Sequence, residues 1–288
     1  MLNTRFLNLP DRGISLHVRC AHAEGGPAVV MSHGLSSNCL TWEQVALKLH
    51  GAGCAVVTVD QRGHGRSDKP DCGYEFESIS ADMEAVITAL KLERPVFLGQ
   101  SWGGNVALHL AATRPGLLSG VGFIDGGFLS LRKSLGSDWE TVKERLSPPD
   151  FRGRQVEDMR EAIQSNHSDW TSTGVQHTLG NFAVADDGTV SPNLSLDNHL
   201  RILHALWEME PADYYREVRV PVLICPAESS DDPERAGYRR QQVAHAEASL
   251  ERCRTVWFED TDHDIHVHRP DRLANVLLEA VSSGFWSD

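Results

Sequence analysis

Four short apolar runs in the first 125 residues constrain the fold of this chain most strongly. They read "AVVMSHG" (28–34), "CAVVTVD" (54–60), "PVFLG" (95–99) and "GVGFID" (120–125), and each ends in glycine or a polar residue. Near-continuous apolar runs of this length are typical of strands that are buried on both faces, as parallel sheets require. The runs therefore predict a parallel sheet that is covered by helices on both sides.

Helical patterns lie between these runs. Thr41 and Gln44 have the spacing of a capping box before a helix. Apolar residues recur at helical spacing between 79 and 90, and "SWGGNVALHLAATR" (101–114) continues as a third helix. Near the start of the chain, residues 4–20 contain two strand patterns around an Asp-Arg-Gly turn, which predicts an antiparallel hairpin at the sheet edge.

The alternation of strand and helix stops after the fourth run. Residues 128–215 are polar and rich in helical patterns, and strand patterns resume at 218–225 and 254–260. We therefore predict an α/β fold with a mostly parallel, doubly wound sheet, formed by residues 1–127 and 216–288. The intervening 128–215 segment is long enough to form a helical cap, or lid.

The composition limits the possible partners. The formal net charge is −13, from 40 acidic and 27 basic residues, which argues against nucleic acid and anionic membranes as partners. No apolar stretch approaches the roughly 18 residues that span a bilayer, and the N-terminal residues lack a secretion signal. The six cysteines contain no CxxC pair, which is typical of reduced thiols. We expect a cytoplasmic protein that acts on a small molecule; the sequence gives no indication of its oligomeric state.

The segment "GQSWG" (99–103) carries the clearest chemical signal. It matches the G-x-S-x-G pattern of a nucleophile elbow, with an apolar strand before it and a helix after it. A sharp strand-to-helix turn strains the central residue and requires small neighbours. The turn would expose the hydroxyl of Ser101 near the positive end of the helix dipole. This context favours a nucleophile over a plain turn.

Three further stretches carry a family resemblance: "SHGLSSN" (32–38), "DQRGHGRSD" (60–68) and "DTDHDIHVHRP" (260–270). With the elbow, and in this order, they make the chain similar to the α/β-hydrolase superfamily over nearly its whole length. The insertion lies where that family places its cap. The resemblance implies a serine hydrolase that needs neither a metal nor an organic cofactor.

The resemblance also assigns roles to other residues. His263 follows the last core strand and precedes Pro270 by the family's spacing, which favours it as the base that activates Ser101. The oxyanion hole would consist of the backbone N–H groups of Leu35 and Trp102. The run "HDIHVH" leaves a metal-binding interpretation open, but the loop context already explains His263 and no matching ligand set recurs elsewhere.

The acid of the triad is where the sequence departs from the family pattern. The usual aspartate position aligns with Ser230, and the nearby carboxylates Glu228, Asp231 and Asp232 are out of register. Asp125, at the end of the preceding core strand, is a second location known in the superfamily. We predict Asp125 as the acid and keep the other three as alternatives.

The leading interpretation is a serine hydrolase that cleaves a carboxylic ester, lactone or thioester through an acyl-enzyme. Alternatives are C–C bond hydrolysis, hydroxynitrile cleavage or perhydrolysis at the same site, or a ligand receptor on the same fold. A serine at position 101 argues against relatives that use an aspartate nucleophile. Four aromatic residues of the insertion are candidates for the substrate pocket: Trp139, Trp170, Phe182 and Trp207.

Overall fold

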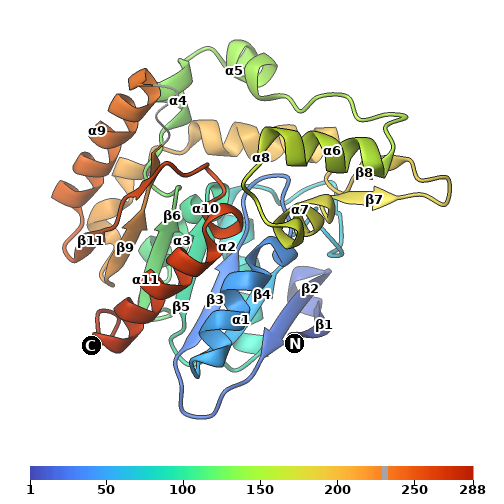
Figure 1. Cartoon of the computed structure of the whole chain (residues 1–288). Helices are drawn as coiled ribbons and strands as arrows, with labels where there is room; N and C mark the ends of the chain where they lie inside the picture. The colour runs from blue at the N-terminus through green and yellow to red at the C-terminus, as the bar shows by residue number, and fades with distance from the viewer. Residues whose placement is uncertain (229–232, 288) are drawn as a thin grey trace.

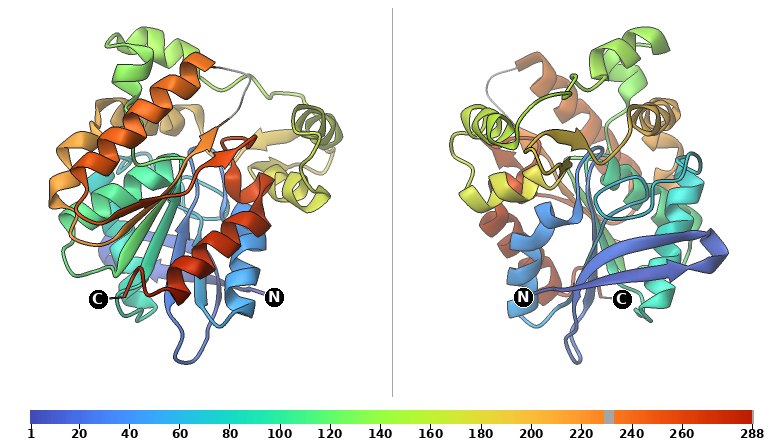
Figure 2. Two further views of the ribbon diagram at one scale, coloured as in Figure 1. Left: turned by 60° about the vertical axis from the view of Figure 1, so that its left-hand side comes forward. Right: turned by 90° about the vertical axis from the view of Figure 1, so that its right-hand side faces the viewer.

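The computed structural model describes residues 1–228 and 233–287. Its main sheet has eight strands in the order β1-β2-β4-β3-β5-β6-β9-β11. The strands are β1 (Asn3–Leu9), β2 (Ile14–Ala21), β3 (Ala28–Ser32), β4 (Ala55–Val59), β5 (Val96–Gln100), β6 (Gly120–Ile124), β9 (Val222–Cys225) and β11 (Cys253–Thr255). The pairs from β4 to β11 are parallel, and the β1–β2 hairpin joins β4 in antiparallel fashion at one edge (Figure 2). The strands predicted from the four apolar runs and the N-terminal hairpin are confirmed.

Helices cover both faces of the sheet (Figure 1). One face packs against α1 (Glu43–Gly51) and α11 (Pro270–Ser282), and the other against α2 (Phe76–Ala89), α3 (Trp102–Thr113) and α9 (Pro233–Ser249). Each face has its own apolar cluster, because the side chains of a strand alternate between the two faces. The doubly wound α/β architecture follows from this two-sided burial.

The predicted capping box before α1 is wrong. Residues Cys39–Trp42 form a short 3-10 helix, η2, and α1 begins only at Glu43 without a side-chain cap. Asn38 caps η2 by accepting from the Leu40 amide at 2.8 Å. The Thr41 hydroxyl donates back to the Asn38 carbonyl, so it is not free to cap α1.

The segment between β6 and β9 lies over the carboxyl ends of the parallel strands (Figure 1). It contains α4 (Leu131–Leu135), α5 (Trp139–Leu146), α6 (Val156–Asn166), α7 (Ser172–Leu179), the hairpin β7 (Phe182–Val184) and β8 (Val190–Pro192), and α8 (Leu196–Glu208). We keep residues 128–215 as the proposed lid. Within the described residues, no helix is long and apolar enough to cross a membrane.

Short elements complete the fold. They are the 3-10 helices η1 (Pro10–Arg12), η3 (Pro211–Asp213) and η4 (Tyr215–Glu217), the parallel pair β10 (Ala227–Glu228) and β12 (Phe258–Glu259), and α10 (Ile265–His268). The β10–β12 pair is a separate two-stranded sheet, whose strands closely follow β9 and β11 in the chain. It positions the loop that follows β12, which contains His263.

Candidate active site

Ser101 lies at the turn between β5 and α3 in a strained backbone conformation. Its φ is 52° and its ψ is −120°, a region that residues other than glycine rarely adopt. A Cβ atom on Gly99 would lie 1.9 Å from the Gly103 carbonyl oxygen, and one on Gly103 would lie 2.6 Å from the Ser32 carbonyl oxygen. Both glycines are therefore required by close backbone contact, and the turn has the geometry of a nucleophile elbow.

Asp125 and His263 form the central contact of the site. The His263 Nδ1 lies 2.5 Å from Asp125 Oδ2, and the Ala227 amide donates to Asp125 Oδ1 at 3.0 Å. The Asp125 side chain is fully buried and follows directly after β6, where its own φ is 47°. With Nδ1 bound to Asp125, the other ring nitrogen of His263 is left for the cavity that Ser101 also lines.

Arg239 contacts the same carboxylate, which sequence reasoning did not anticipate. Its Nη1 lies 3.3 Å from Asp125 Oδ2 and also donates to the Ala227 carbonyl. The residue is buried and comes from α9. Nothing in the local sequence distinguishes Arg239 from its neighbours in this polar helix; only its position in the fold does.

The charges around His263 raise its pKa. Burial lowers the pKa of His263, but the hydrogen bond and the charge of Asp125, together with the charge of Asp264, outweigh it. The net pKa is raised above its ordinary value of 6.5. An imidazole stabilised in its charged form can take up a proton from a nucleophile and release it later.

The alternative acids do not contact His263 in the part of the chain that the structure describes. Glu228 forms a two-pronged ion pair with Arg240, with distances of 2.7 and 2.6 Å. Asp231 and Asp232 lie outside the described residues. Asp125 is thus the carboxylate that the structure brings to His263.

The two amides predicted for the oxyanion hole border the elbow. Trp102 is the first residue of α3, so its N–H has no acceptor within the helix. A Cβ atom on Gly34, next to Leu35, would lie 3.1 Å from the Ser101 Cβ. Within the described residues, neither amide donates a hydrogen bond to another group. Both N–H groups are therefore available to an oxygen at Ser101, and their role stays a prediction.

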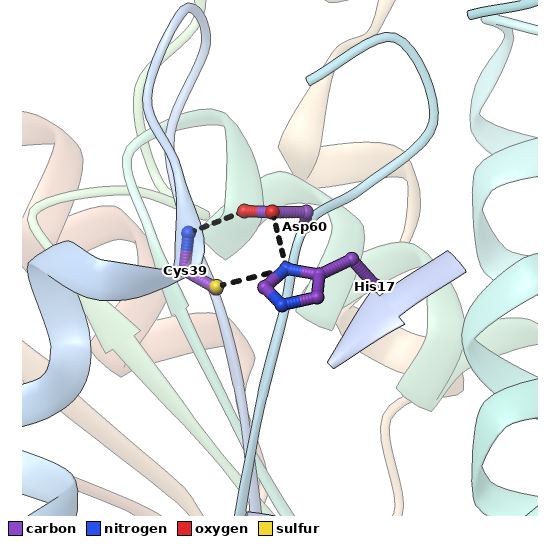
Figure 3. Close-up of side chains that lie close together, drawn as sticks. All are labelled: His17, Cys39 and Asp60. Atoms are coloured by element: carbon purple, nitrogen blue, oxygen red, sulfur yellow. Dashed lines mark hydrogen bonds and ion pairs between the residues drawn. The ribbon is translucent and has the colours of Figure 1, made fainter. Parts of the chain in front are cut away.

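A buried carboxylate, Asp60, fixes the loops behind the site (Figure 3). It accepts from His17 Nδ1 at 2.7 Å, from the Cys39 amide at 2.7 Å and from the Arg66 amide at 2.9 Å. Burial would raise the pKa of Asp60, but these hydrogen bonds and the charge of His33 lower it to about 2. Asp60 thereby ties the loop after β3 to the loop after β4.

The side chains of His17, Cys39 and Asp60 also lie close enough to ligate a metal ion, with their ligand atoms within 4.8 Å of one another. However, burial raises the pKa of the Cys39 thiol well above its ordinary value, and metals bind the thiolate. The oxygens of Asp60 are already used by the hydrogen bonds given above. The cluster is fully explained as a hydrogen-bonded support for the two loops.

Two neighbouring cavities lie between the strand ends and the proposed lid. The smaller has a volume of about 150 Å³ and is lined by Gly34, Leu35, Ser36, Ser37, Thr41, Gln100, Ser101, Thr178, Asn181, His263, Asp264 and Val267. The larger has a volume of about 740 Å³ and shares Ser36, Ser37 and Asn181 with the smaller. The two cavities therefore adjoin at these three residues.

Comparison with known proteins agrees with this geometry. A family model described as the alpha/beta hydrolase family matches residues 29–276. The chain belongs to the alpha/beta hydrolase family. The expected fold class and family resemblance are thus confirmed.

Individual relatives of this alpha/beta hydrolase have varied names. The AB hydrolase superfamily protein YfhM of Bacillus subtilis (strain 168) is 40% identical over 113 residues, which cover 38% of this chain and 39% of that protein. A non-heme chloroperoxidase of Streptomyces lividans is 25% identical over 276 residues, which cover 90% of this chain and 92% of that protein. A solved structure of E-2-(acetamidomethylene)succinate hydrolase has a TM-score of 0.79 at 22% identity, and the match covers 98% of this chain and 100% of that protein. The matches to the first curated relatives span only about a third of those proteins' length.

The four aromatic residues predicted for the substrate pocket have different positions. Phe182 lines the larger cavity beside the site. Trp170 is buried and donates to Asp262 at 3.0 Å. Trp139 lines a separate cleft of about 640 Å³, and Trp207 donates to the Gly136 carbonyl at 3.1 Å. Within the described residues, these three tryptophans pack among lid and loop elements rather than around Ser101.

The other histidines of "HDIHVH" have separate partners. His266 is buried, lies 3.1 Å from the Thr41 hydroxyl, and has a pKa lowered to about 3, mainly by burial. His268 lies 2.6 Å from Asp169 and accepts from the Asp262 amide. The side chains of Asp169, Asp262 and His268 form a second cluster with metal-ligand spacing. His263 points to Asp125 instead, so the three histidines do not converge on one ion.

Proposed function

We propose that this chain is a serine hydrolase that cleaves a carboxylic ester, lactone or thioester of a small molecule through an acyl-enzyme. The observation that carries the proposal is the 2.5 Å contact between His263 and the buried Asp125, at a cavity that Ser101 also lines. A buried carboxylate on Nδ1 fixes the tautomer in which Nε2 can accept a proton. The strained elbow presents the hydroxyl that would lose that proton.

The proposed reaction proceeds in two halves. The Ser101 oxygen attacks the substrate carbonyl while His263 Nε2 takes the hydroxyl proton. The oxyanion then accepts hydrogen bonds from the Leu35 and Trp102 amides. When the tetrahedral intermediate collapses, His263 gives its proton to the leaving alcohol or thiol. A water molecule, deprotonated by the same imidazole, releases the acid from Ser101.

The test combines a covalent probe with a panel of substrates. A fluorophosphonate probe should label the wild-type protein at Ser101 and leave Ser101→Ala unlabelled. The wild type should also hydrolyse short-chain p-nitrophenyl esters or their thioester and lactone counterparts. Labelling that persists in Ser101→Ala would refute the assignment of the nucleophile.

The alternatives predict other results in the same test. Probe labelling without turnover of any ester, thioester or lactone would favour the C–C, hydroxynitrile or perhydrolysis chemistries that the same three residues can support. Absence of both labelling and turnover, in a folded protein, would favour a ligand receptor. The two measurements therefore separate the proposed function from each alternative class.

A further inference from the structure

Asp264 is a carboxylate in the catalytic cavity that the proposed reaction does not use. It directly follows His263 and lines the same 150 Å³ cavity as Ser101. It precedes the short helix α10, where its backbone carbonyl accepts from the Val267 and His268 amides, but its side chain does not cap the helix. Within residues 1–228 and 233–287, the Asp264 carboxylate has no hydrogen bond and no ion pair.

Asp264 is half-buried, and the partial removal of a carboxylate from water costs free energy that a hydrogen bond or counter-charge normally offsets. Two other carboxylates near the site are paired. Asp262 accepts from His167 and Trp170, and Asp125 accepts from His263 and Ala227. Asp264 is therefore available to a bound molecule.

The charge of the cavity points in the same direction. The described residues that line the smaller cavity include neither lysine nor arginine. In the larger cavity the described lining contains Arg152, but its guanidinium donates to Asp150 through contacts of 2.5 to 2.9 Å. Apart from the imidazole of His263, the described lining residues thus offer the Asp264 carboxylate no free cation. An anionic substrate group placed here would meet a like charge in a poorly solvated space.

We propose that Asp264 is a specificity residue that selects esters bearing a protonated amine near the reacting carbonyl and rejects esters bearing a carboxylate. This inference rests on the proposed hydrolase function and narrows its substrate class. The ammonium group would donate to the Asp264 carboxylate and complete its missing hydrogen bonds. Burial raises the pKa of Asp264, so a cationic partner would stabilise the ionised form that burial disfavours.

The test uses three ethyl esters of nearly equal size: ethyl β-alaninate, which is cationic, ethyl butyrate, which is neutral, and monoethyl succinate, which is anionic. The release of ethanol gives kcat/KM for each at pH 7, and each value is divided by the ester's rate constant for alkaline hydrolysis. For the wild type, we expect the cationic ester to exceed the anionic ester by about tenfold or more. The neutral ester should lie between them.

Two variants separate a local effect from the general charge of the protein. Asp264→Asn keeps the size and removes the charge, so the cation-to-anion ratio should fall toward 1. Asp260→Asn removes a charge from the exposed part of the same loop and should leave the ratio within about twofold of the wild type. Because the ratio compares substrates within one variant, any effect of Asp264→Asn on the pKa of His263 cancels.

The outcomes are distinct. If the neutral ester is hydrolysed and the normalised kcat/KM of the anionic ester equals or exceeds that of the cationic ester, the role of Asp264 is overturned. The proposed hydrolase function would still stand. An unchanged ratio in Asp264→Asn would do the same. No hydrolysis of any of the three esters, together with no labelling by the fluorophosphonate probe, would overturn the hydrolase function and this inference with it.

Discussion

Replacing Asp125 by asparagine should abolish most of the activity through the tautomer of His263. The Ala227 amide donates to Oδ1 of Asp125 at 3.0 Å, so an asparagine would keep its amide oxygen there. Its NH₂ group would then face His263 Nδ1, which lies 2.5 Å from the present carboxylate oxygen. Nδ1 would have to accept a hydrogen bond, which leaves the proton on Nε2. In that tautomer His263 cannot take the proton of Ser101.

The size of the loss follows from this geometry. Arg239 Nη1 lies 3.3 Å from Oδ2 of Asp125 and would repel an NH₂ group at that position. This repulsion disfavours the orientation with the NH₂ group toward His263, but the alternative orientation would place that group against the Ala227 amide. The imidazolium also loses its counter-charge in the transition state. By analogy with the same change in another triad, kcat should fall by about 10⁴, which corresponds to about 5 kcal/mol in the activation free energy.

The assay is ester hydrolysis at saturating substrate, with circular dichroism to show that the variant folds. Glu228→Gln is the matched control, because it makes the same amide swap at an alternative acid that is paired with Arg240. We expect its kcat within about twofold of the wild type. Near wild-type turnover of Asp125→Asn, or a large loss in Glu228→Gln, would refute the reasoning and return the acid to the loop after β9.

Four further predictions concern the site and its surroundings. His263→Ala should lower kcat by about three orders of magnitude or more, because triad members act as a unit; a small loss would point to another base. The kcat/KM of the wild type should fall as pH drops through the pKa of His263. Burial lowers this pKa, but Asp125 raises it above 6.5 overall. An acid limb with its midpoint well below 6.5 would contradict the assignment of His263 as the base. His266 has a folded-state pKa of about 3, so between pH 6.5 and 3 the unfolded state binds a proton at this residue that the folded state does not. The free energy of unfolding should therefore decrease as the pH is lowered through that window. In urea titrations, His266→Gln should show a smaller decrease than the wild type. Chelators should leave ester hydrolysis unchanged, and a loss restored by zinc would instead favour one of the two clusters with metal-ligand spacing.

The fold was predictable because its signals are local. Apolar runs such as 54–60 specify strands buried on both faces whatever lies elsewhere in the chain, and the structure places β4 at Ala55–Val59. The elbow was predictable for the same reason, since Gly99, Ser101 and Gly103 define one turn by themselves. The start of α1 was mispredicted because Asn38 caps a 3-10 helix that precedes α1 and the Thr41 hydroxyl donates to the Asn38 carbonyl, which a spacing rule does not weigh.

The contacts around Ser101 needed the tertiary structure. Asp125 and His263 are 138 residues apart, and the sequence offered four carboxylates for one position. The parallel alignment of β6, β9 and β11 brings Asp125 to the histidine loop. Arg239 and Asp264 had no sequence signal, because a buried ion pair and an unpartnered carboxylate are defined by what surrounds a side chain. Short-range sequence thus determined the strands, the elbow and the order of the loops, since backbone conformation depends mainly on neighbouring residues. Which charged groups meet was decided by the packing of strand ends and helices, because electrostatic contacts depend on distance in space and not along the chain.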